Sequence, residues 1–458
     1  MKMKHSVSRR QFIKAAAVSL TFPTLIPASA LGKNGFTAPS DRIVFGCIGL
    51  GGQGRHNMRA FASQADTQVV ALCDVDSGEG EFHNTFGFPG SPNGLTPGLN
   101  DLLKTQSRYN KPSSKDNIKL YGDFRELLQR DDIDAVTVCT PDHWHGIITK
   151  TALENGKDVY CEKPLVNSIP EGREVCNAVN RFGRILQTGS HERSNNSVRY
   201  AYELVANGYI GKLKEIHVQM PNSDPHHNFL RKNTKPKATM PVPESLNYNM
   251  WLGPAPWAPY TLERVHFWWR FITDYGGGEI TDRGAHIIDL AQFINQTDDT
   301  GPVEIIAEGS KVGNGLYNCF IEYAFECRYE KGTKIIGSSK GERGLKLVGT
   351  DGWIFIHIHG GQLTASDPRI LQTKIGPEQI HVERSPGHHR NFLDSVKLRR
   401  KTVANEEIGH RTATICHLLN IAMESGETLK WDPQKEIITN SSIAEKMVHR
   451  PMRPPWSI

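Results

Sequence analysis

Five short apolar runs in the first half of the chain constrain its fold more than any other feature of the sequence. They are RIVFGCIGLG, TQVVALCDVD, DAVTVCTP, DVYCEKP and RILQTGS, and amphipathic segments separate them. A strand that is buried on both faces is apolar along its whole length. Alternation of such strands with helices is typical of a parallel sheet with crossover connections. The sequence therefore predicts an N-terminal α/β domain built on a doubly wound parallel sheet.

The second half of the chain, from about residue 195, has a different pattern. The runs KLKEIHVQM, VEIIAEG, YNCFIEYAF, TKIIGSS, RGLKLVG and GWIFIHI lie close together, and several alternate between apolar and polar residues. This pattern predicts a mainly antiparallel sheet. We expect helices over NNSVRYAYELVANGYIG, ending at Gly211, and near HHRNFLDSVKLRR and GHRTATICHLLNIAMESG. By contrast, FGFPGSPNGLTPGLNDLL, between Gly78 and Asp116, is rich in turn residues and predicts no regular element.

The N-terminus has the pattern of a targeting segment. Arg9 and Arg10 precede a mildly apolar stretch, which leads to Ala-Ser-Ala at 28–30, a sequence typical of a cleavage site. A twin arginine is typical of signals that export folded proteins. A basic N-terminus on a cytosolic protein is the alternative. We predict a signal peptide at 1–30, a linker at 31–40, the twin-arginine export machinery as a partner, and a periplasmic or otherwise exported location. No other segment has the length and apolarity of a transmembrane helix.

Charge and cysteine usage narrow the classes of partner. The chain of 458 residues has 54 basic and 49 acidic residues, a net charge of +5 that is too mixed for a nucleic-acid-binding protein. We therefore expect a small-molecule partner. The 8 cysteines form no CxxC pair and several lie in predicted strands, so we expect them in the core. A disulfide would form only if two of them lie close together.

A glycine-rich turn follows the first predicted strand. Gly49, Gly51 and Gly54 in GLGGQG have the spacing of a dinucleotide-binding fingerprint, in which the pyrophosphate lies at a helix N-terminus. Asp74 ends the second predicted strand, 20 residues after Gly54, where a carboxylate binds ribose hydroxyls and repels a 2′-phosphate. NAD is the predicted cofactor, and Arg55 leaves NADP open. An ordinary strand-to-helix turn is the alternative reading.

Two more predicted strands end in polar residues. Parallel strands present their carboxyl ends to the ligand crevice, so DVYCEKP delivers Lys163 there, and the proline behind it favours an extended backbone. CTPDHWHG likewise brings Thr140 and Pro141 near the cofactor, with His145 at its edge. For His143, packing beside a helix start and a ligand role remain open. No third ligand is evident for an HxH zinc site, so no metal site is predicted.

The segment DYGGGEITDRGAHIIDLAQFI predicts an amphipathic helix in the second domain. Its apolar stripe leaves Asp282, His286 and Asp289 on a separate face, with Asp282 near the helix start. A solvated polar face is the alternative. The three glycines at 276–278 favour close approach of a substrate or cofactor instead.

These motifs, in this order, resemble the Gfo/Idh/MocA family of oxidoreductases over essentially the whole chain after the signal. The resemblance implies an NAD(P)-binding Rossmann domain at 41–192, and at 193–458 an α/β substrate and oligomerisation domain with an open, mainly antiparallel sheet. It implies that Lys163, Asp282 and His286 match the family's catalytic lysine and Asp-x-x-x-His pair. A homo-oligomer through the open face of the second sheet is also implied. The predicted cofactor contacts are Gly49, Gly51, Gly52, Gln53, Gly54, Asp74, Thr140, Pro141, His145, Glu162 and Lys163.

The hypothesis that follows is hydride transfer between the nicotinamide and a secondary hydroxyl of a sugar, glycoside or cyclitol. His286 is the predicted base, Asp282 would orient it, and Lys163 would stabilise the alkoxide, although Lys163 as base or relay stays open. We expect Arg193 and Tyr275 to contact the substrate. An exported enzyme would keep NAD bound and recycle it. An NAD-dependent glycoside hydrolase that oxidises its substrate transiently is the alternative, and a non-catalytic sugar or nucleotide sensor is a third class.

One interval is longer than a minimal member of the family needs. Between KLKEIHVQM and the three glycines, the chain carries PNSDPHHNFLRKNTKPK and LNYNMWLGPAPWAPYTLERVHFWWRF. Its aromatic residues offer platforms for sugar rings, and loop packing or a subunit contact are the alternatives. The tryptophans of this interval are Trp251, Trp257, Trp268 and Trp269.

Overall fold

The computed structural model describes residues 37–78, 93–111, 114–233, 235, 238–313, 315–359 and 361–458. The predicted signal peptide at 1–30 and most of the linker at 31–40 lie outside these residues. Within the described ranges, no helix combines the length and the apolar character that crossing a membrane requires.

The N-terminal sheet has six strands, all parallel, in the order β3-β2-β1-β4-β5-β6. This is the order of the doubly wound dinucleotide-binding fold, in which the ligand crevice lies at the carboxyl ends of the strands where the order reverses. The prediction of a parallel sheet is confirmed. The strands are β1 (Ile43–Ile48), β2 (Thr67–Cys73), β3 (Lys119–Tyr121), β4 (Ala135–Val138), β5 (Asp158–Cys161) and β6 (Leu186–Thr188).

Five helices connect these strands, and one of them corrects the sequence prediction. They are α2 (Gly52–Ala62), α3 (Leu95–Arg108), α4 (Phe124–Leu128), α5 (Asp142–Glu154) and α6 (Ile169–Phe182). The prediction of no regular element between Gly78 and Asp116 is wrong for α3, because Leu99 and Leu102 bury one face of a helix there. Gly98 lets this helix pack on Leu50, whose side chain would lie 2.7 Å from an added Cβ atom. The remainder at 79–92 lies outside the described residues.

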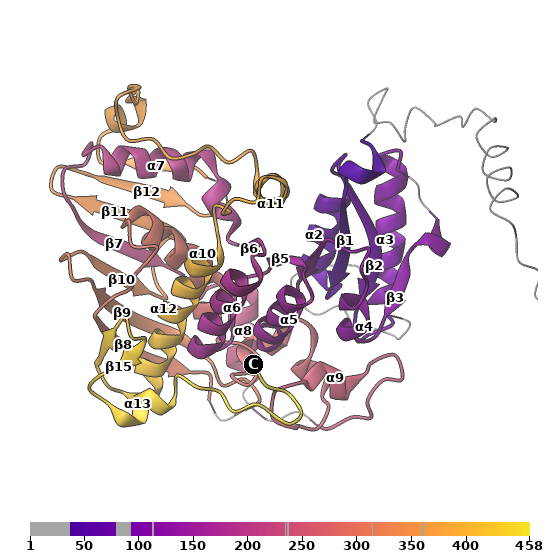
Figure 1. Cartoon of the computed structure of the whole chain (residues 1–458). Helices are drawn as coiled ribbons and strands as arrows, with labels where there is room; N and C mark the ends of the chain where they lie inside the picture. Colours follow the sequence, from indigo (N-terminus) through magenta and orange to yellow (C-terminus); the bar gives the residue numbers. More distant parts are fainter. Residues whose placement is uncertain are drawn as a thin grey trace, which may run out of the picture.

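The C-terminal sheet has nine strands in the order β13-β12-β11-β7-β10-β9-β8-β14-β15. Its pairings are antiparallel except that of β7 with β10, which is parallel. Figure 1 shows α10 (Glu279–Ile294) and α12 (Glu406–Ser425) between this sheet and the N-terminal domain. The predicted mainly antiparallel sheet is confirmed. Its strands are β7 (Leu213–Gln219), β8 (Glu304–Lys311), β9 (Phe320–Arg328), β10 (Lys334–Ser338), β11 (Gly344–Gly349), β12 (Trp353–His357), β13 (Leu363–Ala365), β14 (Leu429–Asp432) and β15 (Ile437–Ile438).

Two C-terminal segments return to the N-terminal domain. In α11 (His388–Leu398), Phe392 packs in one core with Phe45 and Phe61. Trp456, near the end of the chain, lies with its ring 4.7 Å from that of Trp144 in α5. Both contacts hold the two domains together around the crevice.

Of the remaining helices, only α7 (Asn196–Ala206) was predicted from the sequence. The helix expected to end at Gly211 ends earlier, and the others lie in the long interval or near the C-terminus. They are α7 (Asn196–Ala206), α8 (Pro225–Lys232), α9 (Tyr248–Leu252) and α13 (Ser442–Lys446), with short 3-10 helices at His191–Ser194 and His266–Phe271. All eight cysteines are free thiols, and seven are buried, as expected for core residues.

Candidate active site

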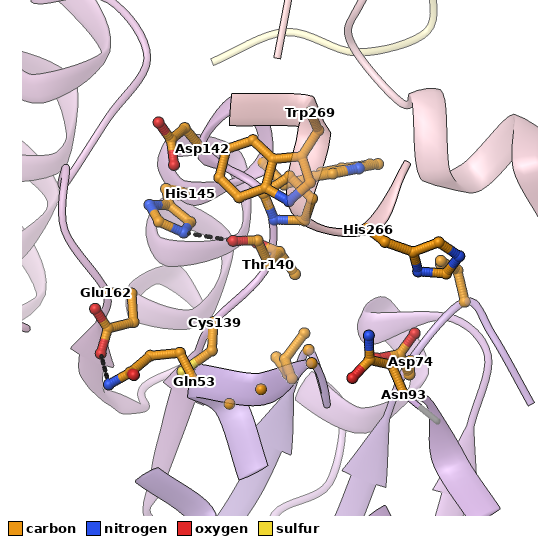
Figure 2. Close-up of a pocket in the computed structure, with 18 of the residues that line it drawn as sticks. Gln53, Asp74, Asn93, Cys139, Thr140, Asp142, His145, Glu162, His266 and Trp269 are labelled. Atoms are coloured by element: carbon orange, nitrogen blue, oxygen red, sulfur yellow. Dashed lines mark hydrogen bonds between the residues drawn. The ribbon is translucent and has the colours of Figure 1, made fainter. Parts of the chain in front are cut away.

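A cavity of about 730 Å³ lies at the carboxyl ends of β1, β2, β4 and β5. Each residue predicted to contact the cofactor lines it, and so do the predicted catalytic residues Lys163, Asp282 and His286. The long interval before α10 forms another wall. In Figure 2, Trp269 and His266 from this interval lie across the cavity from Gln53 and Asp74. Strand ends of one domain and a helix of the other thus meet at a single site.

The glycine turn has the shape that a pyrophosphate needs. Gly49 has a φ of +84°, and a Cβ atom on Gly54 would lie 1.9 Å from the carbonyl oxygen of Gly49, so both positions require glycine for the fold itself. A Cβ atom on Gly51 would instead meet nothing within 4 Å. Gly51 is also the N-cap of α2, whose amide groups have no side-chain cap there. The space beside Gly51 therefore fits a bound phosphate group.

The end of β2 carries two carboxyl groups. Asp74 accepts hydrogen bonds from the amides of Leu50 at 2.6 Å and Asp76 at 3.0 Å, and both aspartates line the cavity. Because of Arg55, the sequence did not exclude NADP as the cofactor. In the structure, the Arg55 guanidinium forms an ion pair with Asp101 at 2.8 Å. Two carboxyl groups at this position, together with an arginine that is already paired with an aspartate, disfavour the 2′-phosphate of NADP and therefore favour NAD.

Glu162 connects the glycine turn to the end of β5. Its Oε1 accepts hydrogen bonds from Gln53 at 3.1 Å and from Asn57 at 2.7 Å, both in α2. Figure 2 shows the bond to Gln53 at the floor of the cavity. Glu162 therefore positions α2 against the segment that carries Lys163.

Lys163 and Asp282 meet in the cavity although 119 positions separate them in the chain. Lys163 Nζ lies 2.6 Å from Asp282 Oδ1 and 3.0 Å from its main-chain oxygen. Burial opposes the charged carboxylate, yet the charges of Lys163 and Arg270 hold the pKa of Asp282 well below its usual range. The pair is thus an ion pair that also joins the two domains.

His286 lies on the next turn of α10 and corrects one expectation. Asp282 was expected to orient its imidazole, but the Asp282 carboxylate binds Lys163 instead. The Nδ1 atom of His286 is buried and has no hydrogen-bond partner among the described residues. Burial and the charges of Lys163, His191 and His359 lower the pKa of His286 well below its usual value. The imidazole is therefore neutral and has an unused polar atom.

Asp142 begins α5 at the edge of the same cavity. Burial raises the pKa of Asp142 to about 8, although the nearby charges of Lys163 and Arg270 act in the other direction. At neutral pH this side chain is therefore a carboxylic acid and can donate a proton. The sequence showed an aspartate at a helix start, a position that usually means capping.

Asp142→Asn is expected to be more stable than the wild type at pH 8, with a difference that shrinks towards pH 4. A carboxyl group whose folded pKa is raised stabilises the fold fully below its unfolded pKa and loses that contribution as the pH rises through the folded pKa. The difference in unfolding free energy should change by at most about 1.4 kcal/mol per pH unit and level off above the folded pKa. Denaturant titrations of both proteins across this range measure it. A difference that does not change with pH would contradict the protonated Asp142.

His143 and His145 have structural contacts. His145 Nδ1 lies 2.6 Å from the carbonyl oxygen of Pro164, and Nε2 lies 2.8 Å from that of Thr140, a contact that Figure 2 shows. His145 thus joins two strand ends at the cavity wall and keeps no nitrogen for the cofactor. His143 is buried, with Nε2 3.0 Å from the carbonyl oxygen of Trp251. Of the two roles left open for His143, packing is therefore favoured over ligand binding.

Arg193 and Tyr275 are not brought into the cavity. Arg193, with a side chain that is 2% exposed, pairs with Asp289 and with Asp298, both at 2.7 Å. Asp289 lies on the same face of α10 as Asp282 but two helical turns further on, about 10 Å along the helix axis, so it is not at the site. Tyr275 is fully buried and accepts a hydrogen bond from Arg264. The expected substrate contacts of Arg193 and Tyr275 are wrong because both side chains serve packing and ion pairing inside the protein.

The three glycines before α10 also serve packing. Added Cβ atoms would meet Trp269 at Gly276, Thr281 at Gly277 and Cys319 at Gly278, at 3.1 Å or less. None of these glycines lines the cavity. Their close neighbours are therefore protein atoms, and the expected approach of a ligand to them is wrong.

The long interval contributes some of its aromatic residues. Trp251, Trp268 and Trp269 pack in one buried cluster, from which Trp251 and Trp269 also line the cavity, whereas Trp257 is 70% exposed. Sequence reasoning missed several other lining residues because no spacing or motif distinguishes them from their neighbours in the chain. They are Asp76, His191, His266, Arg270 and His359.

A doubly wound sheet with this glycine turn, closed by a second domain that supplies Asp282 and His286, defines a two-domain dinucleotide-binding oxidoreductase. The chain belongs to the Gfo/Idh/MocA family. Residues 43–190 match the family's NAD-binding Rossmann fold, and residues 194–458 match its C-terminal alpha/beta domain. The predicted family and NAD-binding domain are confirmed.

Relatives of this chain include sugar-directed enzymes. It is 25% identical over 224 residues to an alpha-N-acetylgalactosaminidase of Shewanella oneidensis, an alignment that covers 46% of this chain and 45% of the relative. It is 26% identical over 178 residues to D-glucoside 3-dehydrogenase of Escherichia coli (strain K12), which covers 39% and 40%. The chain thus spans less than half the length of these curated relatives. A crystal structure of aldose-aldose oxidoreductase from Caulobacter crescentus superposes with a TM-score of 0.56 at 17% identity, over 85% of this chain and 99% of the other, which shows the shared fold.

Proposed function

We propose that the protein is an exported oxidoreductase that transfers hydride between NAD and a secondary hydroxyl or ketone of a sugar, glycoside or cyclitol. The contact of Lys163 with Asp282 at 2.6 Å carries this proposal, because it puts a charged lysine at the strand ends beside the glycine turn. The similarity to D-glucoside 3-dehydrogenase supports a sugar substrate.

Different residues of the cavity would accept the proton of the substrate and stabilise the negative charge on its oxygen. When bound, NAD supplies the hydride acceptor. The hydroxyl must lose its proton to a base within hydrogen-bond reach, and the unpartnered Nδ1 of His286 is suited to that role. An ammonium group has three N–H donors, and Lys163 directs two of them to Asp282, so that the third can hold the substrate oxygen and stabilise its negative charge. Asp282 then acts as a positioning residue for Lys163.

Retention of the cofactor follows from the proposed export. Free nicotinamide cofactor is scarce outside the cytoplasm, so the enzyme would carry its NAD and recycle it within one catalytic cycle. The wall formed by His266 and Trp269 supports retention, because it lies across the cavity from the glycine turn. One sugar would then be oxidised while a second is reduced.

An NAD-dependent glycoside hydrolase is the second candidate. Asp142, a carboxyl group with a pKa of about 8 at the edge of the cavity, favours it, since bond cleavage requires an acid that protonates the leaving group. The similarity to alpha-N-acetylgalactosaminidase points the same way. A purely binding sensor has no need of Lys163, Asp282 and His286 together.

The test begins with the purified protein, which is denatured so that any released nucleotide can be identified by mass spectrometry. We expect about one NAD(H) per chain. The intact protein is then incubated with free sugars and with aryl glycosides. Oxidation of one sugar with reduction of another supports the oxidoreductase, and release of aglycone without net NADH supports the hydrolase. A protein that retains no nucleotide and binds neither NAD nor NADP would contradict both.

The remaining expectations stay predictions. They are the export of the chain by the twin-arginine route, a domain boundary between 192 and 193, and a homo-oligomer through the open face of the nine-stranded sheet. Export is checked by following the full chain into the periplasm, with Arg9 and Arg10 both replaced by lysine as the control.

A further inference from the structure

Two histidines that line the cavity flank a buried glutamate. Glu192 Oε1 lies 3.5 Å from His191 Nε2 and 3.2 Å from His359 Nδ1. One ligand atom from each of the three residues lies within 4.8 Å of the others. His191 and His359 come from segments 168 positions apart in the chain, so only the fold brings them together.

The carboxylate of Glu192 lacks a permanent positive partner. Its side chain is 5% exposed, and among the described residues no lysine or arginine forms an ion pair with it. Its other contacts are the main-chain amide of His359 at 3.3 Å and the side-chain amide of Asn195 at 3.5 Å. A buried charge is costly unless it is paired. A divalent cation held between the three side chains would supply a permanent positive charge.

We propose that His191, Glu192 and His359 bind a divalent transition-metal ion, with Zn²⁺ as the best match. Two imidazoles and one carboxylate are one of the ligand sets of catalytic zinc, which leaves its fourth position open. Tetrahedral ligands at zinc distances lie about 3.3 Å apart, close to the two separations measured from Glu192. The side chains of His191 and His359 are 44% and 46% exposed, so an ion has a path of entry.

A fourth residue shows which way the open position faces. His286 lies with its ring 4.8 Å from that of His191 and 5.8 Å from that of His359, and all three line the cavity. A metal ion held there would offer its open position to an oxygen of a molecule in the cavity. This last role rests on the proposed function, whereas metal binding itself does not.

A second cluster in the described residues is less suited to a metal ion. Asp224, His226 and His227 also place ligand atoms within 4.8 Å of one another. However, Arg283 and Arg343 both pair with Asp224, and His226 and His227 lie within 2.9 Å of Glu279. The charges in this cluster are therefore already paired.

Cobalt binding tests the proposal without any turnover. The full chain, purified without a histidine tag and treated with chelator, is titrated with Co²⁺ while its visible spectrum is recorded, and Zn²⁺ is then used for displacement. We expect one Co²⁺ per chain. Glu192→Gln and His359→Gln should each weaken binding by about a hundredfold or more. His357→Gln is the matched control, because His357 lies 3.1 Å from Glu342 in a two-residue pair, and it should bind Co²⁺ as the wild type does.

Two outcomes would overturn the metal site. One is a wild-type protein that binds neither ion. The other is binding that Glu192→Gln and His359→Gln leave unchanged, including binding that His226→Gln removes instead. Melting temperatures recorded in chelator establish that each variant is folded. NAD titration of the same samples separates this inference from the proposed function, since a protein that binds NAD but no metal contradicts the metal site alone.

Discussion

Lys163→Ala is expected to lower kcat by about a thousandfold, because it removes the group that stabilises charge on the substrate oxygen. NAD binding should change little, since the glycine turn and Asp74 are untouched. The measurement is steady-state turnover of the sugar or aryl glycoside found by screening, together with an NAD titration. Unchanged turnover with normal NAD binding would show that Lys163 is not catalytic.

The Lys163 variant needs a control for stability. Removal of Lys163 leaves Asp282 with Arg270 at 3.5 Å as its nearest remaining ion-pair partner, and an unpaired carboxylate costs stability. The double variant Lys163→Met with Asp282→Asn removes both charges, so it should recover stability but not activity. Lys150→Ala is the matched control for loss of a lysine, because Lys150 pairs with Glu154 on the surface of α5.

Gly51→Ala and Gly54→Ala are expected to fail in different ways. A methyl group on Gly51 enters open space, so the protein should fold normally while its affinity for NAD falls at least about tenfold, or 1.4 kcal/mol. A methyl group on Gly54 collides with the carbonyl oxygen of Gly49, so this variant should lose about 1–3 kcal/mol of stability. Its NAD binding should fall as a consequence.

Calorimetric NAD titration and thermal melting distinguish the two glycine variants. The Gly51 variant should melt with the wild type in the absence of nucleotide, and the Gly54 variant should melt earlier. Gly122→Ala is a control on a glycine that also lines the cavity and has nothing within 4 Å of its Cβ position. If Gly51→Ala bound NAD as the wild type does, the pyrophosphate would not lie beside Gly51.

Motifs that are short in sequence were predicted well. The glycine turn, Asp74 and the lysine after β5 each depend on one strand end, and parallel strands bring such ends to one edge whatever the rest of the chain does. Positions set by helix periodicity were predicted less well. Asp289 shares a face of α10 with Asp282, yet it pairs with Arg193. Helical periodicity predicts on which face of the helix a side chain lies, but not whether that part of the helix reaches the cavity.

Apolar runs, a glycine fingerprint and polar strand ends by themselves determined the doubly wound sheet and the NAD-binding domain, because each is a local pattern with a local physical cause, and the order of the motifs along both domains indicated the family by resemblance. Only the tertiary structure decided that Asp282 pairs with Lys163, that Asp142 is protonated, and that His191, Glu192 and His359 lie close together beside the cavity. Charge pairing and burial depend on distances between segments that lie far apart in the chain, and no local pattern encodes those distances.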